Sequence, residues 1–265
     1  MNQLITLTDQ IGCSVTLQHK PLRIVCLVPS ITELLYTLQL QHYVVGITKF
    51  CVYPSHWLKA ITIIGGTKNV HIDIVKALKP TLIIANKEEN ELPQIEALKS
   101  FCTVYTSNVY NLQTAFTMIE QLGLLTNTSG IASNLVQSIQ SQFDNIKINT
   151  TKKVLYLIWQ NPFITIGGDT FISYLLQQVG LYNVYCLQLR YPTITISDIK
   201  NIEFDYLLLS TEPYPFKQKH VAELQRILPH KNIHIINGEM CSWYGSRLLL
   251  AAEYLQAFKK NLNAQ

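Results

Sequence analysis

Charged residues are scarce in this sequence: Asp, Glu, Lys and Arg make up 14% of its 265 residues. The 21 basic and 17 acidic residues leave a formal net charge of +4, and no basic run is longer than two residues. Nucleic-acid-binding proteins concentrate positive charge in a patch, so we expect no nucleic-acid partner. Long apolar runs are missing as well. No stretch approaches the roughly 20 apolar residues that cross a membrane, and we expect no membrane span.

Residue patterns of metal fingers and common catalytic sites are also missing. The six cysteines form no CxxC pair and no Cys/His pair at zinc-finger spacing, which argues against structural zinc. GxSxG and GxxxxGK[ST] do not occur, and "GGTKN" and "GGDTF" lack the spacing of a dinucleotide-binding loop. The opening residues, Met1–Leu4, show no charged region leading into an apolar one, so no secretory signal is expected there.

With 48% apolar residues the chain is globular, and its pattern of elements occurs twice. The buried-strand run 23–29 precedes the predicted helix "SITELLYTLQL". Ser30 can cap this helix, and Glu33 three residues later completes a capping box. The run 152–159 and the loop "QNPFITIGG" precede "DTFISYLLQQVG", a helix that begins at an Asp/Thr cap and ends at Gly180. Strands that alternate with helices in this way predict two α/β, Rossmann-like lobes with parallel central sheets.

Between the two halves the sequence is helical in pattern. Ile131, Leu135, Ile139 and Phe143 recur every fourth residue, and a helix of about 20 residues is about 30 Å long. We therefore expect one long, rigid backbone helix. At the N-terminus, "LITLTDQIGCSVTL" predicts a short hairpin. The predicted domains are an N-terminal α/β lobe (1–110), a helical linker (111–150) and a C-terminal α/β lobe (151–265).

Polar and aromatic residues gather in the loops that follow predicted strands. In open parallel sheets, ligands bind outside the carboxyl ends of the strands. The loops are "PSITE" after 23–29, "TKFCVYP" after 44–47, "NKEEN" after 81–85, "QNPF" after 154–159, "STEPYP" after 206–210 and "GEMCSWYGSR" after 233–237. We expect loops from both lobes to contribute to one ligand site.

The string "RIVCLVPSITELLYTLQLQHYVVGIT", followed by "IGGTKNVHIDIVKALKPTLIIA", resembles the first lobe of class III periplasmic substrate-binding proteins. These are the receptors of ABC importers for cobalamin, haem and ferric siderophores. The resemblance covers roughly residues 5–260, and "TKFC", "GGTKN", "NKEEN" and "SWYGSR" resemble the helical-backbone metal receptor branch. The matching positions are Pro29, Ser30, Thr32, Glu33, Gly65, Gly66, Ile72, Asp73 and residues 77–83.

The resemblance implies binding rather than catalysis. It implies a monomer that clasps a metal chelate or corrinoid between two lobes and docks to an ABC permease through one carboxylate on each lobe. Asp73 matches the first docking position, and an acid there also suits a helix N-terminus. The second position aligns with Ser197, and its neighbour Asp198 is the carboxylate available. The resemblance implies a periplasmic location, whereas the missing signal leaves a cytoplasmic one as the alternative.

Three kinds of side chain in the loops are candidates for binding the ligand. Aromatic rings supply flat contact area, basic groups pair with acid groups on a chelate, and thiols or carboxylates ligate metals. Thiolates suit soft ions and carboxylates hard ones, so a mixed set makes no coherent site for one free ion. The ligand-binding candidates are Lys49, Cys51, Lys68, Glu88, Trp159, Arg190, Glu212, Trp243, Tyr244 and Arg247, and the metal candidates are Cys51, Glu239 and Cys241.

Two other functions remain open. The first is an intracellular sensor or carrier that uses the same cleft without a permease. The second is a cytosolic α/β enzyme, which unpaired cysteines and the missing signal would suit. The identity of the ligand is open too, and no covalently bound cofactor is implied.

Overall fold

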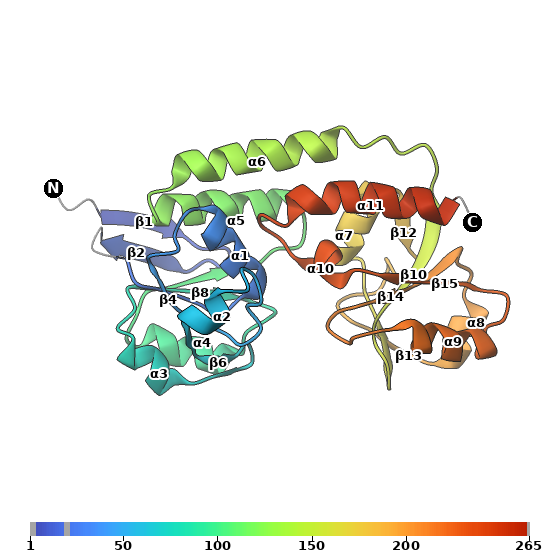
Figure 1. Ribbon diagram of the computed structural model, residues 1–265, viewed down its shortest axis with the longest axis horizontal. Coiled ribbons are helices and arrows are strands. Elements are labelled where there is room, and N and C mark those ends of the chain that lie inside the picture. Colours follow the sequence, from blue (N-terminus) through green and yellow to red (C-terminus); the bar gives the residue numbers. More distant parts are fainter. Residues whose placement is uncertain (1–3, 19–21, 264–265) are drawn as a thin grey trace. The chain divides into compact units, whose positions relative to one another are not determined.

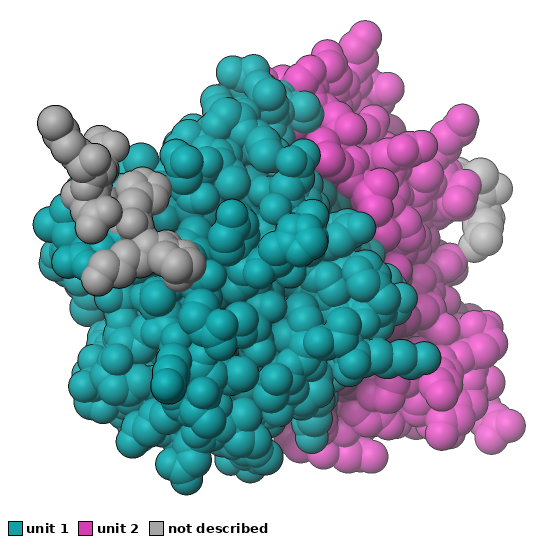
Figure 2. All heavy atoms as spheres, turned by 60° about the vertical axis from the view of Figure 1, so that its left-hand side comes forward, with its two compact units in different colours: residues 1–109, 113–138, 244–247 teal, residues 110–112, 139–243, 248–265 magenta. Residues whose placement is uncertain are grey.

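The computed structural model describes residues 4–18 and 22–263, which form two compact units (Figures 1 and 2). The three opening residues that bear on the signal expectation lie outside this part. Unit 1, teal in Figure 2, contains residues 1–109, 113–138 and 244–247. Unit 2, magenta, contains residues 110–112, 139–243 and 248–265. Residues 244–247 therefore belong with the first unit although both flanking segments belong to the second.

The centre of unit 1 is a five-stranded sheet in the order β5-β4-β3-β8-β9, with every neighbouring pair parallel. Strands β3 and β8 are buried along their whole length, as is typical of parallel strands covered on both faces. The strands are β3 (Ile24–Cys26), β4 (Val44–Ile47), β5 (Thr62–Ile63), β8 (Leu82–Asn86) and β9 (Val104–Ser107). The helices of this part of the chain are α1 (Pro29–Thr37), α2 (Trp57–Ala60), α3 (Ile72–Ala77), α4 (Leu92–Lys99) and α5 (Leu112–Leu125).

Two small hairpins accompany this sheet: β1 (Leu4–Thr8) with β2 (Ser14–Gln18), and β6 (Gly65–Gly66) with β7 (Asn69–Val70). The first confirms the predicted N-terminal hairpin. Its turn is held by buried Asp9, whose carboxylate accepts from the backbone N–H of Ile11 and Cys13 at 3.1 and 2.8 Å. The other carboxylate oxygen accepts from Thr106 N–H at 3.2 Å, which fastens the hairpin to β9.

The predicted capping box at Ser30 and Glu33 is wrong. Helix α1 begins at Pro29 with Val28 as its N-cap, and no side chain caps it. Proline suits the first turn because its missing N–H has no helical acceptor there. Ser30 is thus inside the helix, and Glu33 is available for a different partner.

The expected backbone helix is α6 (Ser129–Asp144), in which Leu135, Ile139 and Phe143 are buried as the spacing predicted. It is separate from α5, because Asn127 between them adopts a left-handed φ of 57°. Gly123 allows the two helices to approach closely: a Cβ at this position would lie 2.5 Å from the Cβ of Ala132. The boundary between the units falls inside α6, after Ser138.

Unit 2 contains a mixed sheet in the order β13-β11-β10-β14-β15, with β12 also paired to β10. The pairs β10–β12, β10–β14 and β14–β15 are parallel as expected, but β11 is antiparallel to β10 and β13. The segment "QNPFITIGG", expected as a loop, turns back after β10 and pairs with it as β11. The strands are β10 (Lys152–Trp159), β11 (Phe163–Thr165), β12 (Leu181–Asn183), β13 (Thr193–Ile194), β14 (Tyr206–Ser210) and β15 (Asn232–Ile236).

Two helices of unit 2, α8 and α9, pack onto an apolar cluster that includes Leu155 and Leu207 of the sheet, Ile199 of α8 and Leu224 of α9. The predicted helix after Thr170 is confirmed: its hydroxyl accepts from Ser173 N–H at 3.2 Å. In the described part of the chain, no helix combines the length and the apolar character needed to cross a membrane. The helices are α7 (Phe171–Gln178), α8 (Ile196–Asn201), α9 (Gln218–Ile227), α10 (Gly238–Ser242) and α11 (Leu248–Asn263).

Candidate ligand-binding site

In unit 1, the loops after the strands are joined by residues 244–247. Arg247 is 6% exposed and forms a two-point ion pair with Glu33 of α1. Its Nε lies 2.9 Å from Glu33 Oε2 and its Nη2 2.8 Å from Oε1. The guanidinium also lies over the Tyr53 ring, 4.3 Å from the centroid. Arginine suits this position because its planar fork matches both carboxylate oxygens while its face covers an aromatic ring.

Tyr244 makes a second polar contact within unit 1. Its hydroxyl donates a 2.8 Å hydrogen bond to Glu89 Oε1, in the loop after β8. Burial, followed by the charge of Glu89, raises the pKa of Tyr244, so the phenol stays protonated and acts as a donor. The chain can approach α1 because Gly245 has a φ of +110°, and a Cβ there would lie 3.3 Å from the Leu34 Cβ.

The loop after β8 is shaped by Asn86, which sequence reasoning overlooked. The Asn86 side-chain oxygen accepts from the N–H of Glu88 at 2.8 Å and of Glu89 at 3.2 Å. Its amide group donates to Ser107 at 3.0 Å. Such a turn, in which an Asn side chain bonds to backbone two and three residues ahead, fixes the direction of the loop. It places Glu88 and Glu89 at the carboxyl end of β8.

The two lysine candidates lie on the surface of unit 1. Lys49 is exposed and its Nζ lies 5.1 Å from the centroid of the Phe50 ring. Lys68 pairs with Glu91 at 3.1 Å and donates to the Glu88 carbonyl at 3.4 Å. An exposed ion pair of this kind contributes little stability, so Lys68 can change partner at small cost.

In unit 2, aromatic and acidic groups meet at the carboxyl ends of β10 and β14. Trp243 is 7% exposed, and its Nε1 donates to Glu212 Oε2 at 3.1 Å. Trp159, the last residue of β10, is 39% exposed and meets the ring of Tyr214 edge to face at 5.5 Å. The structure thus brings two pairs together here, Trp243 with Glu212 and Trp159 with Tyr214. Only the second pair includes a ring with a large exposed area.

Arg190 lies in another loop of unit 2, between β12 and β13. Its backbone N–H donates to Asp169 Oδ1 at 2.6 Å, and its Nη1 lies 3.9 Å from Asp169 Oδ2. Its φ of 61° is the left-handed conformation. Close approach to Gly167 and Gly168 holds this loop, because the N–H groups of both glycines donate to it.

The thiol candidates are buried in their own units. Cys51 accepts hydrogen bonds at 3.1 Å from Thr32 and is 3.2 Å from the hydroxyl of Thr48, and burial raises its pKa. Burial raises the pKa of Cys241 to about 12. Both sulfurs therefore stay protonated near neutral pH, whereas metals bind the thiolate. Glu239 lies half-buried in the first turn of α10. Residues 4–18 and 22–263 contain no cluster of three or more His, Cys, Asp or Glu side chains arranged around a metal position.

The two docking candidates are both exposed at helix N-termini. Asp73 is in the first turn of α3. Asp198 forms a capping box with Thr195 in α8, and its Oδ2 accepts from the Thr195 N–H and hydroxyl at 2.7 Å each. These hydrogen bonds lower the pKa of Asp198. The carboxylate of Asp198 thus has a structural role in its own helix.

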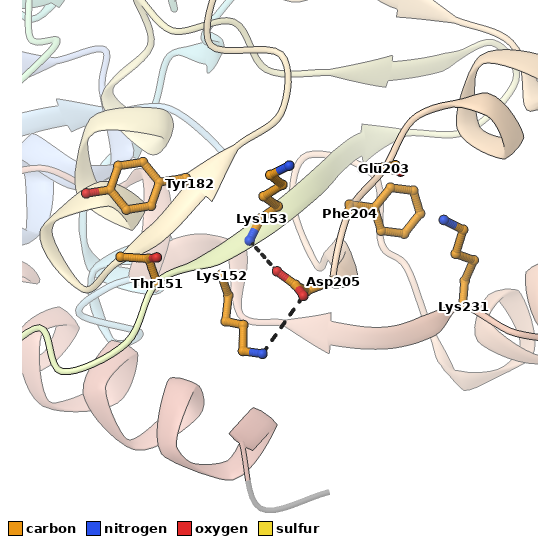
Figure 3. Close-up of a pocket in the computed structure, with 8 residues that line it drawn as sticks. All are labelled: Thr151, Lys152, Lys153, Tyr182, Glu203, Phe204, Asp205 and Lys231. Atoms are coloured by element: carbon orange, nitrogen blue, oxygen red, sulfur yellow. Dashed lines mark hydrogen bonds and ion pairs between the residues drawn. The ribbon is translucent and has the colours of Figure 1, made fainter.

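A large open pocket lies at the opposite, amino end of the unit 2 strands and includes Lys152, Lys153 and Lys231 (Figure 3). The three lysines do not converge on one point. Lys152 Nζ lies 3.9 Å from Asp205 Oδ1, and Lys231 Nζ lies 4.2 Å from the centroid of the Phe204 ring. The side chain of Lys153 points away from that of Lys152 (Figure 3). Strand-end ligand sites of parallel sheets form at the carboxyl ends, so we do not place the ligand here.

Sequence reasoning missed several residues of both units. The sequence predicts a capping role for Glu33 and no role for Tyr53. An Arg in the last strand-end loop and a Glu in the first helix form a recognisable charge pair only when the fold is known. Tyr214 could have been noticed, because it follows a predicted strand within "STEPYP". The residues whose contacts were not predicted from the sequence are Glu33, Tyr53, Asn86 and Tyr214.

Two α/β units with aromatic and charged loops at strand ends define a binding protein of the two-lobed type. The periplasmic binding protein family matches residues 24–227, and the chain belongs to this family.

Individual relatives match most of the chain. It is 27% identical over 269 residues to the uncharacterized ABC transporter substrate-binding lipoprotein YvrC of Bacillus subtilis, with 95% of this chain and 84% of the relative covered. It is 25% identical over 249 residues to the vitamin B12-binding protein of Vibrio vulnificus, with 91% of each covered. The crystal structure of the periplasmic heme-binding protein HutB of Vibrio cholerae has a TM-score of 0.78 and 21% identity, covering 91% of this chain and 99% of that one. This last likeness shows the fold and confirms its class.

Proposed function

We propose that the protein is the substrate-binding receptor of an ABC importer and captures a metal chelate or corrinoid. Membership of the periplasmic binding protein family across residues 24–227 is the observation that carries this proposal. It is supported by relatives that are an ABC transporter substrate-binding lipoprotein and a vitamin B12-binding protein. The same relatives support a location outside the cytoplasmic membrane.

The exposed side chains of each unit suit a ligand with a flat face and acidic groups. Trp159 offers an exposed indole surface at the end of β10, and conjugated rings stack on such surfaces. Lys49, Lys68 and Arg190 are exposed cations on loops, suited to carboxylate or phosphate groups. Cys51 and Cys241 are fully buried, which favours an ion that arrives already chelated. Trp243, Tyr244 and Arg247 are buried against protein partners, and their part in binding is to shape the loops that bear the contacts.

A thermal-shift panel with cobalamin, cobinamide, haemin, ferric siderophores and free metal ions tests the proposal. A ligand present at about a hundred times its Kd should add about 2.7 kcal/mol of apparent stability. Hits are then titrated by tryptophan fluorescence in Trp159→Ala, with Trp57→Phe as control, since Trp57 is buried in α2. We expect weaker binding in the first variant and unchanged binding in the second. A panel without a chelate or corrinoid hit would contradict the proposal.

Docking to the permease is proposed to involve Asp73 and, on the second unit, the N-terminus of α8 around Asp198. Charge reversal at Asp73 should reduce cellular uptake of the ligand and leave its affinity for the purified protein unchanged. Asp144→Lys, at the exposed end of α6, is the matched control. Normal uptake by Asp73→Lys would refute a docking role for this carboxylate.

A further inference from the structure

In unit 2, the exposed indole of Trp159 packs against Tyr214, and Tyr214 packs against His220. His220 is not itself part of the proposed ligand contact. Trp159 meets Tyr214 edge to face with ring centroids 5.5 Å apart and an interplanar angle of 66°. Tyr214 in turn meets Phe216 at 4.7 Å and His220 at 5.4 Å. Phe216 and His220 are 2% and 5% exposed. The exposed indole is therefore the outermost ring of a packed series whose inner members are fixed in the core.

Hydrogen bonds determine which nitrogen of His220 carries the proton. The backbone N–H of Lys217 donates to Nδ1 at 2.8 Å, at the start of α9. A nitrogen that accepts a hydrogen bond has no proton, so the neutral ring carries its proton on Nε2. Nε2 lies 3.4 Å from the Tyr214 hydroxyl, and the N–H there points its dipole at the phenol oxygen.

Tyr214 is also held by its backbone. Its N–H donates to the Ile158 carbonyl at 3.3 Å, one residue before Trp159. The loop after β14 is thus attached to the end of β10 at the residue that precedes the exposed indole. Tyr214, with its ring next to His220 and its backbone bonded to Ile158, is thus placed so that its ring packs edge to face against the indole of Trp159.

We propose that His220 and Tyr214 are positioning residues, which hold Trp159 as a pre-oriented wall for a flat, conjugated ligand. This inference rests on the proposed function only for the ligand contact, because the packing of Trp159, Tyr214 and His220 is a property of the protein alone. Orienting a side chain before the ligand arrives removes the cost of ordering it during binding.

Two amide substitutions separate the roles of the two imidazole nitrogens. In His220→Asn the side-chain oxygen lies where Nδ1 was and can accept from Lys217 N–H, while the contact to Tyr214 is lost. In His220→Gln the longer side chain reaches toward Tyr214, and the acceptor for Lys217 is lost. We expect His220→Asn to retain the melting temperature better and to weaken ligand binding more. His230→Asn, at an exposed position, is the control for both.

The orientation of Trp159 is measured by acrylamide quenching of its fluorescence. The Trp159 signal is obtained by subtracting the fluorescence of the same variant that also carries Trp159→Phe. This subtraction removes the emission of Trp57 and Trp243, which both proteins share. His220→Asn and Tyr214→Phe should both increase quenching of Trp159. The haemin or cobalamin Kd should rise about 2- to 10-fold, as for loss of one oriented aromatic contact, and this rise should vanish in the Trp159→Phe background.

The two arms of the experiment fail separately. Unchanged Trp159 quenching in His220→Asn and Tyr214→Phe would overturn the positioning role, whatever the binding result. A second outcome would also overturn the positioning role. In it, quenching increases, but His220→Asn raises the Kd by the same factor with Trp159 present and in the Trp159→Phe background. His220 would then not act through the indole. If no macrocycle binds the wild-type protein, the proposed function has failed, while the quenching arm still decides whether His220 orients Trp159.

Discussion

Replacing Arg247 by Met should destabilise unit 1, because the Glu33 carboxylate would lose the cation that faces it. The two side chains are joined at 2.9 and 2.8 Å, and Arg247 is 6% exposed. Breaking a fully buried pair by removing one partner costs about 3–5 kcal/mol. The side chain of Glu33 remains 21% exposed, so water offsets part of this loss, and we expect about 2–3 kcal/mol.

The loss can be measured by urea and thermal unfolding followed by circular dichroism. A decrease of this size corresponds to a fall in Tm of about 5–10 °C for a unit of this length. Arg226→Met, at an exposed position in the last turn of α9, is the matched control and should stay within about 0.5 kcal/mol of the wild type.

A double-mutant cycle with Glu33→Gln isolates the pair. If the two side chains stabilise the protein through each other, the double variant should be less destabilised than the sum of the single variants, by at least about 1 kcal/mol. Additive losses, or an Arg247→Met protein as stable as the wild type, would refute the reasoning.

Three further predictions concern other parts of the chain. Gly168→Ala should destabilise unit 2, because its Cβ would lie 2.0 Å from the Cys186 carbonyl oxygen. Gly130→Ala in α6 has open space around it and should instead stabilise the protein by about 0.5–1 kcal/mol. Equal effects of the two substitutions in urea unfolding would contradict this. Burial raises the pKa of Cys241 from 9.0 to about 12. The free energy of unfolding should therefore be unaffected by this group below pH 9 and should fall as pH rises toward 12, by up to about 1.4 kcal/mol per pH unit. In Cys241→Ala, the free energy of unfolding should fall less steeply with pH. A thiol reagent should label exposed Cys186 in the folded protein well before Cys26, Cys51 and Cys241, which are buried; simultaneous labelling would show that the buried positions open readily.

The sequence predicted the elements well where hydrophobic pattern alone decides. The boundaries of β4, β10 and β14 match the predicted runs at 44–47, 152–159 and 206–210 closely. The Thr170 cap was predictable because its hydrogen bond is local. The antiparallel return of β11 was not, because "QNPFITIGG" has the composition of a loop and becomes a strand only by pairing with β10 and β13.

The candidate residues were found by position, but their partners were not. Trp243 and Arg247 were recognised as unusual residues in the last strand-end loop, and the structure gives each an acidic partner, Glu212 and Glu33. These contacts join residues 31 and 214 positions apart. No local pattern carries such information, since the same side chains would read identically if they faced solvent. What each candidate contributes to ligand binding stays a prediction.

Residues 244–247 have a consequence for the way the chain is made. Unit 1 draws most of its residues from the first half of the sequence, yet Glu89 and Glu33 meet their partners 155 and 214 residues later. At the usual rates of synthesis of about 5–20 residues per second, Arg247 is synthesised roughly 10–40 s after Glu33. Unit 1 is therefore completed by a segment that leaves the ribosome only after residues 139–243 of unit 2. A chain truncated after α6 would carry every strand of that unit and still lack the residues that close it.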